Sequence, residues 1–152
     1  MITEKFLTNL QSLKAKVPQF AVDAVKENAD LIISIIKGKQ LSKGLDSKGN
    51  LMGRYSASTE GYAERDNIST PKTPGAAYNF YWSGETLENL YIKSVNKGQS
   101  TFNISTVASK KKLLESIYGE IFDLTEAHND MVNETIIEPY VAKKIEENML
   151  DF

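Results

Sequence analysis

The chain has 152 residues, of which 41% are hydrophobic and 25% are charged. This size and composition predict one globular domain with a single core, and they exclude collagen-like and wholly disordered classes. The sequence has no cysteine and one histidine, His128. Disulfides, thiolate-bound metals and thiol catalysis are therefore excluded, and no two-histidine metal site can form.

The net charge of -2 is distributed unevenly. Residues 39–112 hold eleven Lys and Arg against six Asp and Glu, whereas residues 113–152 hold two Lys against ten Asp and Glu. Copies with a basic middle and an acidic end can attract each other head to tail if the two patches lie on different faces. The alternative is that the charges only keep the surface soluble.

No targeting or membrane-spanning signal is visible. The opening residues lack a basic region followed by an apolar one, and the longest apolar run, 31–36, is interrupted by Ser34 and bounded by charges. Such a run is too short to cross a bilayer. We therefore expect no membrane association and a product made in the cytoplasm.

The first predicted element is a helix over about 4–37. Apolar residues recur at steps of three and four from Phe6 to Ile36, Thr3 is a plausible N-cap, and Lys37-Gly38 is a typical stop. Pro18 lies inside this pattern, so the helix either kinks there or restarts with Pro18 in its first turn.

Residues 39–82 change in character. Five glycines, two prolines and many Ser and Thr predict a long loop or arm with few buried positions, and such loops are usually functional. Within it, Asp46 to Asn50 has turn chemistry between apolar residues, which predicts a small hairpin or an Ω-like loop.

A short helix and a hairpin follow. Ser83 and Gly84 precede acidic and apolar residues, as at a helix start. Alternating residues around a turn at 96–99 predict strands near 91–96 and 101–107. Residues 113–118 are expected to form one or two helical turns, ended by Gly119.

The last predicted element is a helix over about 126–149, capped by Thr125. Its inward positions are Val132, Ile136 and Tyr140, and Pro139 implies either a kink or two helices meeting before it. The expected fold is one α+β domain, 1–152. It has a long N-terminal helix (1–38) and C-terminal helices (108–152) packed on a small antiparallel sheet (83–107), with the long loop (39–82) outside.

Motifs for chemistry are incomplete. Gly44 and Gly49 have the spacing of a phosphate-binding loop, but Asn50-Leu51 stands in place of Lys and Ser or Thr. The beginning of an EF-hand at Asp46 fails because Lys48 stands at a ligand position and Ala57 at the twelfth. We therefore predict no cofactor, no metal site and no catalytic residues, and expect His128 to lie on an exposed helical turn.

Aromatic residues are concentrated in and beside the Gly/Pro segment, together with the only two arginines of the chain. Arg, Tyr and Trp are enriched at the centres of protein interfaces, so this set predicts an assembly surface. The alternative is that Phe80 and Trp82 close the core. The predicted interface residues are Arg54, Tyr55, Tyr62, Arg65, Tyr78, Tyr81 and Trp82.

The order of parts over about 44–107 resembles the tailed-phage virion morphogenesis and tail-completion proteins. The resemblance rests on GLDSKGNLMGRYS at 44–56, then Thr59, then WSGETLENLYI at 82–92 and a hairpin. That family has a loop containing Asp-x-x-Gly before a Thr/Ser-Gly-x-Leu-x-x-Ser-Ile element. The present chain has one extra residue between Gly84 and Leu87, and Asn89 or Leu90 replaces the small residue.

The resemblance implies a structural virion subunit that forms a homo-oligomeric ring at the head-to-tail junction or upper tail. Its implied partners are further copies of itself and other neck or tail proteins. DNA could pass through the ring without sequence-specific binding. Two alternatives remain, a cytoplasmic adaptor that binds one host protein, and a hydrolase or nucleic-acid-processing enzyme that uses His128 with Asp130 or Glu126. The three lysines at 110–112 could contact nucleic acid, but a run of three lysines more often indicates a solvent-exposed turn.

Overall fold

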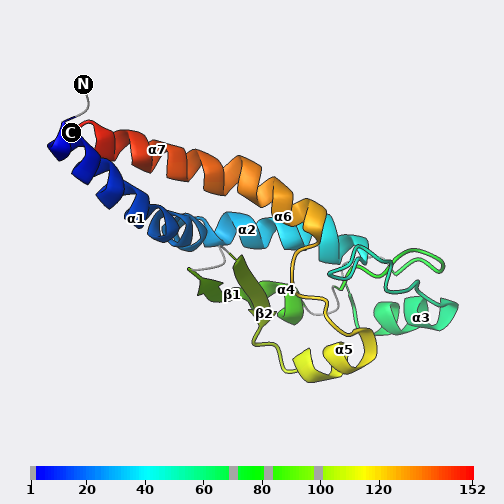
Figure 1. Cartoon of the computed structure of the whole chain (residues 1–152). Helices are drawn as coiled ribbons and strands as arrows, with labels where there is room; N and C mark the ends of the chain where they lie inside the picture. Colours follow the sequence, from blue (N-terminus) through cyan, green and yellow to red (C-terminus); the bar gives the residue numbers. More distant parts are fainter. Residues whose placement is uncertain (1–2, 69–71, 81–83, 98–100) are drawn as a thin grey trace.

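An arm of two long helices extends from a loop-rich body. The computed structural model describes residues 3–68, 72–80, 84–97 and 101–152. Helix α1 (Glu4–Glu27) lies beside helix α7 (Glu138–Met149), and both ends of the chain lie at the free end of this arm (Figure 1). The small sheet lies against α1 and α2 in the middle of the molecule, and together with the short helices α3, α4 and α5 beyond it forms the body (Figure 1).

The first helix begins as predicted and is interrupted later than expected. The hydroxyl of Thr3 accepts a hydrogen bond from the Phe6 amide at 3.2 Å. Helix α1 continues through Pro18 and ends at Asn28, which separates it from α2 (Ala29–Ile35). The side chain of Asn28 donates to the carbonyl of Ala24 at 2.8 Å, so the break is stabilised by a local hydrogen bond. The alternative of a restart at Pro18 is therefore wrong.

The predicted stop at Lys37-Gly38 is also wrong. A π-helical turn (Ile36–Gln40) runs through Gly38, a 3₁₀ turn (Leu41–Lys43) follows, and the chain leaves the helix at Gly44, whose φ is +75°. Both Gln40 and Leu41 are fully buried. Because these two side chains are buried in the core, the backbone stays helical beyond Gly38. The helical segment ends where Gly44 takes the left-handed conformation.

The last helical segment is confirmed over 126–149. Thr125 caps α6 (Glu126–Val132) by accepting from the His128 amide at 3.1 Å. A π-helical turn (Asn133–Ile137) connects α6 to α7. Pro139 stands in the first turn of α7, where its missing N–H costs little.

The sheet is the predicted antiparallel pair of strands, whereas Gly98 and Gln99 of the predicted turn lie outside the described residues. Strand β1 (Leu90–Asn96) pairs with β2 (Thr101–Thr106), with Ile92 opposite Ile104 and Val95 opposite Phe102. The register shifts between Ile92 and Ser94, as at a β-bulge. The predicted α+β class is thus confirmed, with α1 and α2 packed on β1.

One continuous core joins the hairpin to the helices. Its buried residues come from α1, α2 and the two turns after α2, from both strands, and from residues 121–122, α6 and the π-helical turn after it. The apolar stripe of the helices and the apolar positions of the strands therefore pack against each other. The core residues are Ala24, Val25, Ile32, Ile33, Ile36, Leu41, Leu90, Ile104, Ile121, Phe122, Val132, Ile136 and Ile137.

The described residues between 39 and 80 are more structured than predicted. They contain helix α3 (Ala57–Arg65), whose first turn carries Glu60 and whose last turn carries Arg65, in accord with the helix dipole. The predicted turn at Asp46 is confirmed, because its carboxylate accepts from the amides of Lys48 and Asn50 at 2.9 Å.

Two short helices flank the hairpin. Helix α4 (Glu85–Glu88) precedes β1, and α5 (Lys111–Tyr118) follows β2 and ends at Gly119 as predicted. The expected cap Ser83 lies outside the described residues. Among the described helices, none is both long enough and apolar enough to cross a membrane.

Candidate functional site

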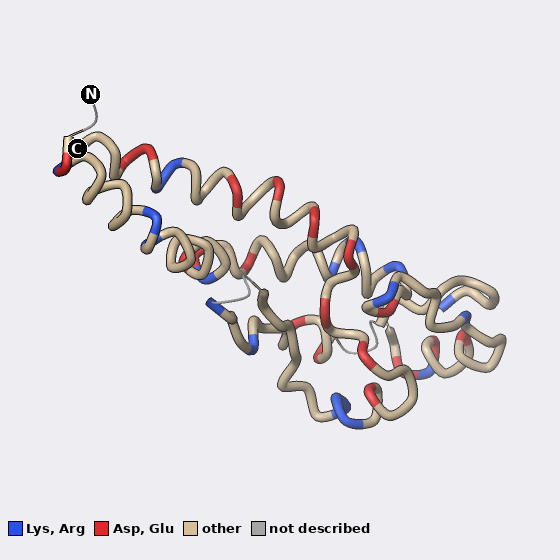
Figure 2. The backbone as a smooth tube through the Cα atoms, in the orientation of Figure 1, with Lys and Arg blue, Asp and Glu red and all other residues tan. Residues whose placement is uncertain are grey.

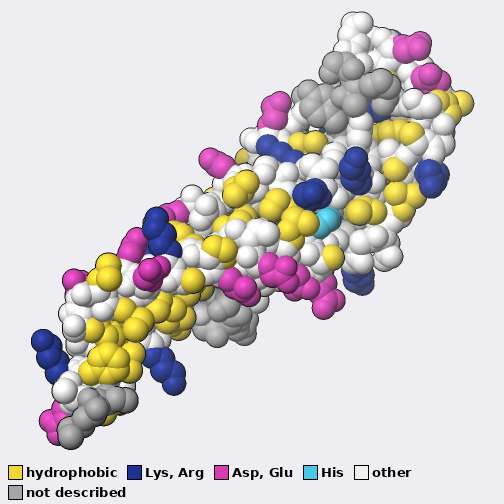
Figure 3. All heavy atoms as spheres, turned by 90° about the horizontal axis from the view of Figure 1, so that it is seen from above, with side chains coloured by type: hydrophobic (Ala, Val, Ile, Leu, Met, Phe, Trp, Pro, Cys, Tyr) yellow, Lys and Arg dark blue, Asp and Glu magenta, His cyan; other side chains and the backbone are white. Residues whose placement is uncertain are grey.

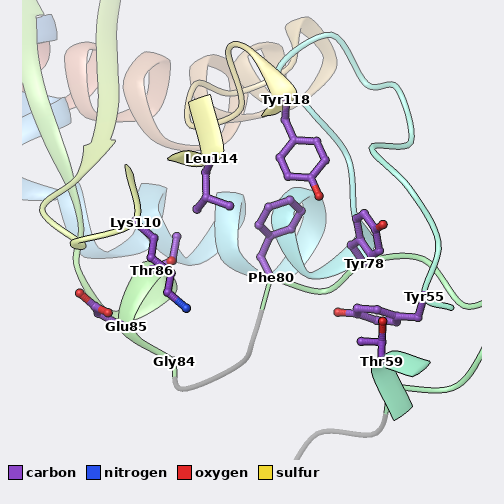
Figure 4. Close-up of a pocket in the computed structure, with 10 residues that line it drawn as sticks. All are labelled: Tyr55, Thr59, Tyr78, Phe80, Gly84, Glu85, Thr86, Lys110, Leu114 and Tyr118. Atoms are coloured by element: carbon purple, nitrogen blue, oxygen red, sulfur yellow. The ribbon is translucent and has the colours of Figure 1, made fainter. Parts of the chain in front are cut away.

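A pocket of about 300 Å³ lies between the short helices of the body. Helices α3, α4 and α5 and the segment 78–80 surround it, and four aromatic rings form much of its wall (Figure 4). The lining residues are Tyr55, Thr59, Tyr78, Phe80, Gly84, Glu85, Thr86, Lys110, Leu114 and Tyr118.

The four rings contact one another in a chain. The ring centroids of Tyr55 and Tyr78 are 5.0 Å apart, those of Tyr78 and Tyr118 are 6.1 Å apart, and those of Phe80 and Tyr118 are 5.8 Å apart. The last two pairs meet edge to face, the favourable geometry for aromatic quadrupoles. All four side chains are only half-buried, so the aromatic wall faces solvent through the pocket.

Two glycines allow the chain to approach this wall closely. A Cβ on Gly44 would lie 2.5 Å from the carbonyl oxygen of Tyr78, and a Cβ on Gly53 would lie 2.8 Å from Cζ of its ring. The amide of Tyr78 donates to the carbonyl of Gly53 at 3.1 Å, beside an isolated bridge between Arg54 and Ala77. The glycines at 44 and 53 therefore allow this segment to pack directly against the backbone and the ring of Tyr78.

A polar network fixes the ring of Tyr55. Its hydroxyl donates to Oδ1 of Asn79 at 2.8 Å and accepts from the Asn79 amide at 2.9 Å. The ammonium of Lys72 donates to the same Oδ1 at 2.6 Å and lies 5.2 Å from the centroid of the Tyr55 ring. Burial raises the pKa of Tyr55 and lowers the pKa of Lys72. One face of Tyr55 is thus taken by a cation of its own chain.

The charged end of the pocket is formed by Glu85 and Lys110. The carboxylate of Glu85 accepts from the amide of Ser109 at 2.8 Å and from its hydroxyl at 3.3 Å, and these bonds hold the pKa of Glu85 below its usual range. Lys110 is exposed at the pocket edge and also favours the charged form of Glu85.

The structure brings together only some of the predicted interface residues. Tyr55 and Tyr78 line the pocket, whereas Arg54, Tyr62 and Arg65 lie outside it. The guanidinium of Arg54 donates to the carbonyl of Gly75 at 2.7 Å. Arg65 pairs with Asp66 at 3.1 Å and lies 4.9 Å from the centroid of the Tyr62 ring.

Two of the predicted residues cannot be compared. Tyr81 and Trp82 lie outside the described residues. Tyr118 and Leu114, which were not among the predicted interface residues, line the pocket from α5. Their spacing of four residues on a short amphipathic helix was a usable signal, because such pairs share one helix face.

The outer face of α5 is apolar and exposed. Leu113 and Ile117, which also share a helix face, are 56% and 60% exposed, and Val107 just before the helix is 70% exposed. Helix α5 therefore carries apolar side chains on two faces, one toward the pocket and one toward solvent. Exposed apolar clusters of this kind mark contact surfaces.

The single histidine has a structural contact, which corrects the expectation of an exposed turn. Nδ1 of His128 lies 3.2 Å from Oε1 of Gln40, which also accepts from the Thr125 amide at 2.9 Å. Nε2 of Gln40 donates to the carbonyl of Asp123 at 2.7 Å. The half-buried imidazole reaches the surface in the view of Figure 3.

Within the described part of the chain, the printed side-chain contact of His128 is to Gln40 and not to an acidic residue. No hydrogen bond joins His128 to Glu126 or Asp130 there, and no group of three His, Cys, Asp or Glu side chains is placed to hold a metal ion. The arrangement of the pocket suits binding of an apolar group next to a charge.

No protein-family model, curated protein or solved structure matches this chain.

Proposed function

We propose that this chain is a structural subunit of a tailed-phage virion, which assembles into a ring at the head-to-tail junction or upper tail through contacts between copies. The observation that carries the proposal is the exposed apolar face of α5. Leu113 and Ile117 lose their contact with water only when a partner covers them, and exposed apolar patches of monomeric proteins are usually small.

The charge distribution supports contacts between unlike surfaces. Asp and Glu side chains recur along α6 and α7, interrupted by two lysines on α7, and four lysines lie within 37–48 (Figure 2). If patches of opposite sign lie on different faces, they favour a head-to-tail contact over a two-fold one, because a two-fold axis would place like patches together. A head-to-tail contact gives a ring when its rotation closes. The family resemblance over 44–107 supplies the virion part of the proposal.

A mass measurement tests assembly directly. Size-exclusion chromatography with light scattering, followed by electron microscopy, should show a closed oligomer of the purified chain. The double substitution Leu113→Glu, Ile117→Glu should abolish it while circular dichroism stays unchanged, because both side chains are exposed. Leu31→Glu is the matched control, since Leu31 is 52% exposed on α2. A parent that stays monomeric at all concentrations would contradict self-assembly.

The virion part needs a separate test. Mass spectrometry of purified phage particles should find the chain at a stoichiometry set by one ring per particle, and its gene should lie beside those for portal and major capsid proteins. An adaptor would instead be a monomer that binds one host protein.

A further inference from the structure

We propose that the aromatic pocket receives the side chain of Leu150 of a neighbouring copy as an apolar anchor, with the adjacent Asp151 paired with Lys110. This inference rests on the proposed self-assembly and names a further contact that it requires, beside the outer face of α5.

The first observation is the exposure of Leu150. Its side chain is 81% exposed, the largest exposed fraction of any large hydrophobic residue in the described chain, although it directly follows a helix whose inner face is packed on α1. Met149 beside it is 43% exposed. By contrast, Phe152 packs edge to face on Phe6 with centroids 5.8 Å apart. Phe152 therefore fixes the end of the segment to α1, while the side chain of Leu150 points into solvent.

The second observation is the geometry of the molecule. Residues 149–152 lie at the free end of the arm, and the pocket lies in the body at the opposite end (Figure 1). Helix α1 alone has 24 residues, which corresponds to about 36 Å. The segment cannot reach the pocket of its own chain, so only a second copy can supply it.

The third observation is complementary chemistry. A volume of about 300 Å³ walled by Leu114 and four aromatic rings accepts an aliphatic side chain. Within the described contacts, Lys110 forms no ion pair, while the neighbouring Glu85 already accepts two hydrogen bonds from Ser109. The pocket edge thus offers a cation to an acidic segment.

The contact has two unlike halves, which gives a sharp complementation test. Thr59→Trp fills the pocket from α3, and Leu150→Ser removes the anchor. Each variant alone should fail to self-assemble. An equimolar mixture should stop at a two-copy complex, because one intact pocket and one intact segment remain for a single contact. Ser58→Trp and Leu7→Ser are matched controls, since Ser58 does not line the pocket and Leu7 is exposed on α1.

Charge exchange tests the polar half. Lys110→Glu should weaken assembly, Asp151→Lys should do the same, and the two substitutions together should restore it. Lys112→Glu makes the same charge change on an exposed residue that does not line the pocket. Assembly of Thr59→Trp or Leu150→Ser equal to the parent would overturn the inference while leaving ring formation itself intact.

A peptide assay separates this inference from the proposed function. An amidated, fluorescently labelled peptide of residues 143–152 should bind the Leu150→Ser protein saturably, and should bind its Thr59→Trp derivative at least about tenfold more weakly. This outcome would support the pocket contact even if the parent did not form a ring. Equal binding to both proteins, or no binding, would overturn it.

Discussion

Gly53 lies against the ring of Tyr78 so closely that any side chain there would occupy the position of the ring. The ring cannot move aside freely, because it contacts Tyr55 on one side and Tyr118 on the other. Glycine at this position is required by contact and not by backbone conformation, since Gly53 does not have a positive φ.

We expect Gly53→Ala to destabilise the fold by about 1–3 kcal/mol, the usual cost of overpacking. Gly61→Ala is the matched control, because a Cβ there meets no atom within 4 Å and Ala is favoured over Gly in helix α3 by about 0.5–1 kcal/mol. Urea unfolding should therefore shift in opposite directions for the two variants. A Gly53→Ala midpoint at or above the parent would show that the ring can yield.

Buried Gln40 is expected to matter more than the only histidine. Gln40→Leu would leave the Thr125 amide and the Asp123 carbonyl without their partner, at about 1–3 kcal/mol for each buried group. His128→Ala removes one hydrogen bond of a half-buried side chain, which costs about 0.5–1.5 kcal/mol.

Denaturant unfolding of the two variants checks this order. His128→Ala should also retain any activity found for the parent, since no described contact places His128 in a catalytic group. Loss of a purified activity at an unchanged melting temperature would contradict the structural role assigned to His128.

The stripe of the first helices gives a clean test of the core. Ile32 is fully buried and the adjacent Leu31 is 52% exposed. We expect Ile32→Ala to cost about 2–5 kcal/mol, whereas Leu31→Ala should change stability by about 0.5 kcal/mol or less. Equal midpoints in urea would mean that Ile32 does not belong to the core of its own chain.

Local signals predicted the fold well where one periodic face dominates. The stripe through Ile32 and Ile36 and the alternation of the hairpin each follow from burial of one face. The predicted end of the first helix was wrong because Gln40 is buried by partners more than 80 residues away. No local sequence pattern indicates such a contact.

The candidate site shows the same division. Tyr55 and Tyr78 were found from composition, because aromatic residues in a glycine-rich segment are unusual. Tyr118 was missed because it joins them only through tertiary packing of α5 against that segment. The guanidinium of Arg54, another predicted interface residue, donates to the carbonyl of Gly75 in its own chain, a contact that composition does not indicate.

Tyr140 on α7 should make the arm sensitive to alkaline pH. Burial, a hydrogen bond to Glu27 on α1 and the negative charges around it raise the pKa of Tyr140 to about 12. The ordinary pKa of tyrosine is about 10, so the folded state favours the neutral phenol. The resulting stabilisation is fully present below about pH 10 and is lost as the pH rises through about 12.

We therefore expect the absorbance titration of the folded protein at about 295 nm to have a late step near pH 12, and Tyr140→Phe to remove it. The same variant should lose less stability than the parent between about pH 10 and 12, because phenylalanine has no proton to lose. Glu27→Gln keeps the shape of the partner but removes its charge, so it should move the late step toward lower pH. An unchanged late step in Tyr140→Phe would show that another tyrosine titrates there and would contradict the raised pKa of Tyr140.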